Sequence, residues 1–133
     1  MSTPEKAKEI GEWMTVARMD WARIPRNLRD EDPNAAGFFL QQSLEKYLKA
    51  FLLTRGWDLV KIHELDALLD DAVAYEPALR SFYPLCERVT SYYFLDRYPP
   101  LGLLDTTCVD IERDLADARD LIRTLFPDEN LSP

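Results

Sequence analysis

Four polar residues that could carry chemistry lie at helical spacing in one segment that is otherwise apolar. Gln42, Glu45, Lys46 and Lys49 are three or four residues apart, so they share one face of the helix expected over residues 34–55. Glu45 precedes Lys49 by four residues, the favourable order for an ion pair within a helix. The two lysines repel each other, and they cost desolvation on an apolar helix unless they stay hydrated or find anions. The stripe therefore indicates either a solvated helix edge or a site for a phosphate group.

His63 is the single histidine of the chain and lies between Gly56 and the next expected helix. An imidazole exchanges protons near neutral pH, but acid–base catalysis requires a partner within hydrogen-bond distance. A lone histidine before a helix is more often a cap or a packed polar group than a catalyst. Because Cys86 and Cys108 form no CxxC pair and there is no second histidine, the sequence predicts no metal site.

A proline-stiffened loop follows the fourth expected helix and contains Arg97, Tyr98, Pro99 and Pro100. Pro99 disfavours the helical conformation at Tyr98, so the loop restricts where Arg97 points. A guanidinium matches a phosphate with a two-point fork, and Tyr98 could donate a hydrogen bond or stack on a base. Alternatively, Arg97 caps the end of the preceding helix, where a positive charge is favoured.

Apolar residues recur every three or four positions along most of the chain, and no long stretch alternates with the period of a strand. This pattern predicts an all-α fold, an up-and-down antiparallel bundle of about five helices. The expected helices cover residues 3–28, 34–55, a short stretch after His63, about 79–95, and 105–126. The second is apolar over most of its circumference, which places it at the centre of the bundle.

Several residues predict where these helices bend, begin or end. Pro25 should kink the first helix or end it early, and the regular part of the fourth helix should begin only at Pro84. Gly56 is suited to the C-terminal cap of the second helix. Thr107 and Asp110 have the spacing of a capping box at the start of the last helix.

The length and composition predict one globular domain. A single helical domain over residues 1–126 is expected, followed by a flexible tail over 127–133. The chain of 133 residues is 47% hydrophobic and 30% charged, and it carries a net charge of −8. That charge argues against broad DNA binding, which needs many contacts from Lys and Arg to phosphates, but it leaves room for a local basic pocket.

The same composition suggests where the protein works. The N-terminal segment lacks the apolar core of a signal peptide, and no apolar run reaches the ~20 residues that span a bilayer. The two cysteines have the pattern of ordinary thiols in a reducing compartment. We therefore expect a cytoplasmic protein that is not associated with a membrane.

Three segments in order resemble the landmarks of a known family. The run FLQQSLEKYLKAFL at residues 39–52 is similar to the second-helix signature of HEPN domains. The run KIHEL at 61–65 and the RYP loop at 97–99 are similar to the next two landmarks. These segments lie in the middle half of the chain, and the expected number of helices agrees with the family.

The resemblance implies a compact helical bundle that often forms homodimers. It also implies a link to nucleotides, because small members are often encoded beside a minimal nucleotidyltransferase partner. Other members are ribonuclease toxins of toxin–antitoxin pairs, which carry Arg, then four to six residues, then His. This chain departs from that motif: no histidine follows Arg97, and seven residues separate Arg55 from His63. The departure argues against RNA cleavage.

We therefore interpret the chain as a HEPN-like module, without a cofactor, that binds a nucleotide or RNA phosphate or serves a nucleotidyltransferase partner. The predicted ligand-binding residues are Gln42, Lys46, Lys49, His63, Arg97 and Tyr98. Two alternatives remain. One is a divergent ribonuclease toxin in which His63 and Arg97 are the candidate catalytic residues. The other is a structural module for dimerisation or assembly.

Overall fold

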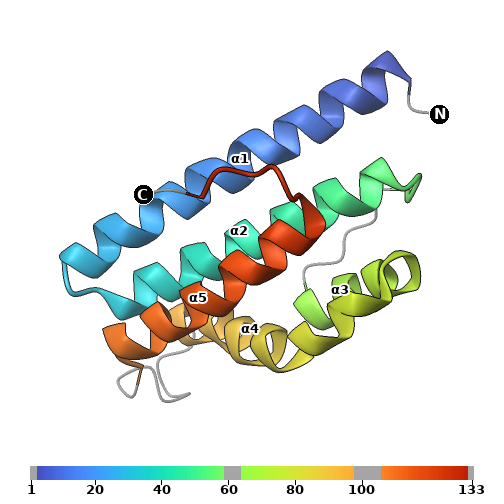
Figure 1. The fold of residues 1–133 in the computed structure, drawn as a ribbon. Helices are drawn as coiled ribbons and strands as arrows, with labels where there is room; N and C mark the ends of the chain where they lie inside the picture. The colour runs from blue at the N-terminus through green and yellow to red at the C-terminus, as the bar shows by residue number, and fades with distance from the viewer. Residues whose placement is uncertain (1–2, 59–63, 98–105, 132–133) are drawn as a thin grey trace.

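The protein is an all-α bundle, and in the part of the chain that the structure describes five α-helices and one 3₁₀ helix follow one another (Figure 1). The computed structural model describes residues 3–58, 64–97 and 106–131, with the backbone alone for 94–97. The elements are α1 (Pro4–Arg29), α2 (Pro33–Thr54), α3 (Leu65–Tyr75), η1 (Pro77–Phe82), α4 (Tyr83–Arg97) and α5 (Cys108–Leu125). No strand occurs in these ranges. The predicted fold class is confirmed.

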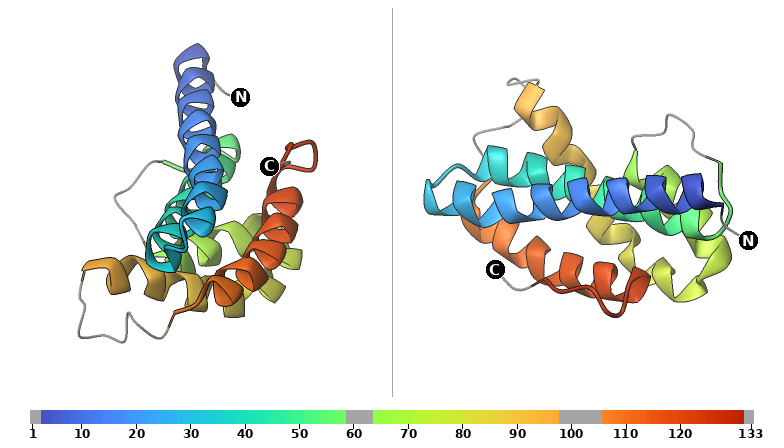
Figure 2. Two further views of the ribbon diagram at one scale, coloured as in Figure 1. Left: turned by 90° about the vertical axis from the view of Figure 1, so that its left-hand side faces the viewer. Right: turned by 90° about the horizontal axis from the view of Figure 1, so that it is seen from above.

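Helix α2 forms the centre of the bundle, as its apolar circumference predicts. It contacts α1, α3, α4 and α5, and Figure 2 shows α1 on one outer side of it with α4 on the other. Its side chains at Leu40, Leu44, Tyr47, Leu48 and Phe51 are buried among residues from every other α-helix. A helix that is apolar on all sides is stable only where other helices cover each of its faces.

Helix α1 continues past its internal proline. The sequence predicts a kink or an early end at Pro25, yet the helix extends four residues further, to Arg29. Pro25 removes one backbone N–H donor from the helix. Ile24 is fully buried beside it and Leu28 packs against the core one turn later. Burial of these two side chains offsets the loss of one hydrogen bond.

The predicted cap at Gly56 is confirmed, and its geometry explains why glycine stands there. Gly56 has a φ of +88°, a conformation that L side chains rarely adopt. The Gly56 amide donates to the Leu53 carbonyl over 3.2 Å, and the Trp57 amide donates to the Leu52 carbonyl over 3.0 Å. This pair of hydrogen bonds is the Schellman motif, which satisfies the last carbonyls of a helix.

The other two predicted boundaries are also found. Residues 77–82 form a 3₁₀ helix and the regular helix α4 begins at Tyr83, so Pro84 lies in its first turn, where no N–H is needed. Helix α5 begins at Cys108, later than expected, with Thr107 as its N-cap. The Thr107 side chain accepts from the Asp110 amide while the Asp110 carboxylate accepts from the Thr107 amide.

Residues 126–131, the C-terminal segment, pack against the bundle where the sequence predicts a flexible tail. Leu131 is only 2% exposed and belongs to the core, and the segment runs back from α5 across α1 in Figure 1. Glu129 accepts hydrogen bonds from Arg18 on α1 and Tyr47 on α2. Its polar composition suggests solvent exposure, but these long-range contacts hold it in place.

Two features are absent from the described residues. No helix there is both long and apolar enough to cross a bilayer. No group of three or more His, Cys, Asp or Glu side chains in those residues is arranged to hold a metal ion.

Candidate functional site

The lysines of the polar stripe form ion pairs with carboxylates of this chain. Lys49 is only 3% exposed, and its Nζ lies 2.7 Å from Glu45 Oε1 and 5.1 Å from the centre of the Trp13 ring. Lys46 Nζ lies 2.6 Å from Asp20 Oδ2 and 3.0 Å from Gln42 Oε1. Each lysine therefore has one anionic partner, and the stripe lies between α1 and α2.

Asp20 is the partner that the sequence interpretation did not include. It lies 26 residues before Lys46 and is nearly buried on α1, where it also accepts from Arg23 Nη1 over 2.7 Å. The available signal was an aspartate within the apolar face of α1, between Ala17 and Ile24. A charge in such a position needs a partner from the helix that covers it.

Three predicted site residues cannot be placed by their side chains. Arg97 is the last residue of α4, which is described there by its backbone alone, and His63 and Tyr98 lie outside the described residues. The structure therefore brings Gln42, Lys46 and Lys49 together. Their convergence with His63, Arg97 and Tyr98 stays a prediction.

A second polar cluster joins α4 to α5 around Asp114, whose side chain is fully buried. Its carboxylate accepts from Tyr92 Oη over 2.6 Å and from Arg88 Nε over 2.9 Å. Burial, the hydrogen bond to Asp114 and the negative charge of that carboxylate raise the pKa of Tyr92 well above its usual range. The phenol therefore stays protonated and acts as a hydrogen-bond donor that holds the two helices together.

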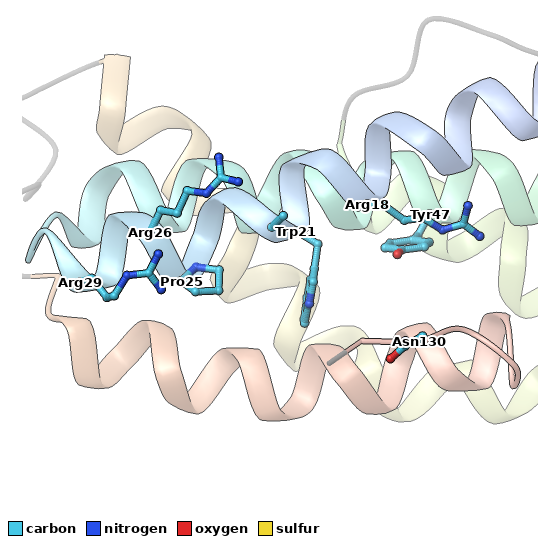
Figure 3. Close-up of a pocket in the computed structure, with 8 residues that line it drawn as sticks. Arg18, Trp21, Pro25, Arg26, Arg29, Tyr47 and Asn130 are labelled. Atoms are coloured by element: carbon cyan, nitrogen blue, oxygen red, sulfur yellow. The ribbon is translucent and has the colours of Figure 1, made fainter. Parts of the chain in front are cut away.

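A pocket of about 360 Å³ lies on the side of α1 away from the polar stripe, and three arginines line it. We call it the arginine pocket. Its lining residues are Arg18, Trp21, Ala22, Pro25, Arg26, Arg29, Tyr47 and Asn130. Figure 3 shows the labelled side chains of α1, with Trp21 extending toward α5 and Asn130 on the C-terminal segment.

Few carboxylates neutralise the arginines around this pocket. Arg26 and Arg29 make no ion pair with any described residue, and neither does Arg119, whose guanidinium lies 5.8 Å from the centre of the Trp21 ring. Within the described ranges, Arg18 is the one of these arginines that has a carboxylate partner, which is Glu129. Like charges that gather without counterions raise the local positive potential, which favours an anionic ligand.

Glu129 lies beside the pocket and is held by a strong set of donors. Arg18 Nε and Nη2 donate to its two oxygens over 2.9 and 3.0 Å, and Tyr47 Oη donates over 2.6 Å. Burial alone would raise the pKa of Glu129, but the hydrogen bonds from Arg18 and Tyr47 and the charge of Arg18 outweigh it and lower the pKa. The Arg18 guanidinium and the Tyr47 phenol therefore already bind one carboxylate, that of Glu129. The two N–H groups of Arg18 donate to its two oxygens in parallel, which is the arrangement in which arginine binds anionic groups.

The comparison with family models decides the identity of this fold. The model of the HEPN domain matches residues 10–128, which include all of α2 to α5 and most of α1. The chain belongs to the HEPN domain family. No curated protein and no solved structure matches it.

The HEPN match includes most of the arginine pocket, so the pocket is part of the domain. Every lining residue except Asn130 lies within 10–128. Sequence interpretation missed the pocket although Arg18, Ala22, Pro25 and Arg29 follow helical spacing along one face of α1. Arginines on a surface helix usually indicate only solvation, and the pocket needs Tyr47 and the C-terminal segment as its opposite wall.

Proposed function

We propose that this HEPN domain binds a nucleotide through its phosphate groups, with the arginine pocket as the binding site, and that it does not cleave RNA. The observation that carries the proposal is the arrangement of Arg18, Arg26 and Arg29 around one concave surface of a protein whose net charge is −8. In such a protein, a local concentration of arginine is unfavourable unless it meets an anion.

The chemistry of the pocket suits the two parts of a nucleotide. Guanidinium groups donate paired hydrogen bonds to phosphate oxygens. Trp21, Ala22 and Pro25 supply apolar wall, and Asn130 brings amide hydrogen-bonding groups to the opposite side. The volume of about 360 Å³ falls within the roughly 300–1,000 Å³ typical of small-molecule sites.

This proposal moves the expected ligand from the stripe on α2 to the other side of α1. Lys46 and Lys49 already have Asp20 and Glu45 as partners, whereas Arg26 and Arg29 have no described carboxylate partner. A phosphate at the stripe would have to compete with those carboxylates at short range. At the arginine pocket, the described carboxylate that it would face is Glu129, and Arg26 and Arg29 have no ion pair with any described residue.

The absence of RNA cleavage is proposed from the sequence. No arginine of this chain is followed by His63 at a spacing of four to six intervening residues. Without a histidine close to an arginine, the general base and the phosphate-stabilising cation of RNA transesterification are not supplied by a local motif.

Calorimetric titration with inorganic pyrophosphate, AMP, ATP, GTP and a short single-stranded RNA tests the site. We expect a nucleotide or pyrophosphate to bind, and Arg26→Gln/Arg29→Gln to weaken that binding by about 10-fold to 100-fold, since a charge-assisted hydrogen bond contributes about 1.5–3 kcal/mol. If the RNA bound more tightly than every mononucleotide, the pocket would instead be a binding site for an RNA chain.

Lys8→Gln/Arg80→Gln is the matched control, because it removes two positive charges from exposed positions that do not line the pocket. It should bind each ligand as the unmodified protein does. If both double variants weakened binding equally, the change in net charge would explain the loss of affinity, and the pocket residues would have no specific role. No binding of any of these ligands at millimolar concentration would refute the proposal.

A further inference from the structure

Glu129 already occupies two of the hydrogen-bond donors that line the arginine pocket. Arg18 and Tyr47 donate to its carboxylate, and the Glu129 side chain is only 6% exposed. Asn130, the next residue, lines the pocket together with Arg18 and Tyr47 (Figure 3). Glu129 lies beyond residues 10–128, so the HEPN match does not account for this contact. A phosphate in the pocket would need the same donors that the carboxylate now uses.

The C-terminal segment, residues 126–131, is anchored at its two ends by apolar side chains. Phe126 packs against Tyr47 with their ring centres 6.2 Å apart, and Leu131 is buried in the core. The residues between these anchors, apart from Glu129, are exposed, and none of the segment is helical. Irregular backbone with few buried side chains opens at a lower free energy than the core of a protein. The contact of Glu129 can therefore break while the bundle stays folded.

We propose that Glu129 is an internal competitor for the arginine pocket, and that a ligand with a chain of phosphates displaces its carboxylate from Arg18. This inference concerns the regulation of the proposed nucleotide site and rests on that proposed function. The exchange gives Arg18 and Tyr47 a phosphate oxygen in place of a carboxylate oxygen. The ligand also contacts Arg26 and Arg29, which have no described carboxylate partner. These additional contacts favour the ligand over the internal carboxylate.

The spacing of the arginines along α1 decides which ligands compete with Glu129. Arg18 lies eight residues before Arg26 and eleven before Arg29, or about 12 and 17 Å along the helix axis. A single phosphate held by Arg26 and Arg29 therefore leaves the carboxylate in place. A chain of phosphates that extends along α1 reaches Arg18, where an acceptor of the same charge is already bound. Glu129 thus raises the concentration that a triphosphate needs, but not the concentration that a monophosphate needs.

The donors themselves are suited to either acceptor. Burial, and after it the hydrogen bond to Glu129, raises the pKa of Tyr47 far above its usual range, so the phenol stays protonated. The Arg18 guanidinium stays charged at any ordinary pH. Occupancy of these donors therefore depends on which anion binds them, and the ligand concentration determines when the C-terminal segment is released.

Calorimetric titration of Glu129→Gln with ATP and with AMP tests the competition, because the two ligands share a base and a ribose. ATP should bind this variant about 10-fold more tightly than the unmodified protein, since it no longer competes with a carboxylate for charged hydrogen bonds. AMP should bind both proteins equally. Asp128→Asn is the matched control: it removes the same charge from the adjacent exposed residue, and it should leave both affinities unchanged. Equal tightening for ATP and AMP would reveal only a general electrostatic effect and would overturn the competition.

Hydrogen–deuterium exchange of the unmodified protein tests the release without any substitution. The backbone amides of residues 128–131 should exchange faster when ATP saturates the protein, whereas AMP should leave their exchange unchanged. Slower or unchanged exchange with bound ATP would mean that the ligand binds beside a closed segment, and it would overturn the inference. The proposed site would then still stand if Arg26→Gln/Arg29→Gln weakened ATP binding. No binding of ATP, AMP or pyrophosphate to either the unmodified protein or Glu129→Gln would overturn this inference together with the proposed function.

Discussion

Tyr92 and Asp114 join α4 to α5 through a 2.6 Å hydrogen bond to a carboxylate that has no solvent exposure. Asp114→Ala should lower the free energy of unfolding by about 1–3 kcal/mol, because the buried Tyr92 hydroxyl would lose its acceptor and Arg88 would lose its shorter ion pair. Urea denaturation measures the loss. Asp117→Ala is the matched control: Asp117 is 52% exposed and accepts from the same Arg88 over 3.1 Å. It should cost less than about 1 kcal/mol. Equal losses would contradict the structural role of Asp114.

Gly37 lies where α2 packs tightly against α4 and α5. A Cβ atom there would lie 2.9 Å from Tyr92 Cγ and 3.1 Å from Ile111 Cδ1. Gly37→Ala should therefore destabilise the protein by about 1–3 kcal/mol through overpacking. Gly11→Ala offers the opposite case on the exposed side of α1, where a Cβ would meet nothing within 4 Å. It should stabilise by up to about 1 kcal/mol through helix propensity. Thermal unfolding of the two variants should shift in opposite directions.

The contact of Glu129 with Arg18 and Tyr47 should make stability depend on pH. The pKa of Glu129 in the folded protein lies below its ordinary value of 4.5. Its contribution to the free energy of unfolding is therefore complete well above pH 4.5, and it decreases as the pH falls below that value and through the folded-state pKa. Glu129→Gln should remove this part of the acid dependence, measured by urea denaturation between pH 3 and pH 7. The adjacent and exposed Asp128, replaced by Asn, should leave the profile unchanged.

The stripe on α2 can be tested as a structural element. Lys49→Met should lower the free energy of unfolding by about 3 kcal/mol, because it leaves the Glu45 carboxylate buried without its ammonium partner. Glu45→Leu/Lys49→Met should recover most of that stability. Both variants should bind pyrophosphate as the unmodified protein does. Loss of anion binding in the stable double variant would instead support the predicted ligand site at Gln42, Lys46 and Lys49.

The isolated protein should show no detectable cleavage of single-stranded RNA, because its histidine lacks an arginine at the spacing of the ribonuclease motif. Incubation with a fluorescently labelled RNA under single-turnover conditions measures this. Cleavage that disappears in His63→Ala and in Arg97→Ala, with the fold retained, would establish the ribonuclease alternative.

Much of the fold could be predicted from local patterns in the chain. The helical period, the apolar circumference of α2, the cap at Gly56 and the capping box at Thr107 all depend on residues close in sequence, and each is confirmed. Continuation of α1 past Pro25 could not be predicted in the same way. It depends on burial of Ile24 and Leu28 against residues from other helices.

In the candidate site, too, the local sequence predicted which residues share a helix face, but it did not predict their partners. Spacing alone placed Gln42, Lys46 and Lys49 on one helix face, but the partner of Lys46 is Asp20, 26 residues earlier. Whether a cation faces a ligand or a carboxylate depends on which helix covers it, and that is decided only when the helices pack.

The sequence by itself determined the helical fold, the caps at Gly56 and Thr107, the family resemblance and the polarity of each helix face, because these follow from the order of neighbouring residues. The tertiary structure decided which charges are compensated. It brought Glu129 to Arg18 across 111 residues and left Arg26 and Arg29 without a described carboxylate partner. Electrostatic energy depends on distance through space, and separation along the chain does not specify that distance.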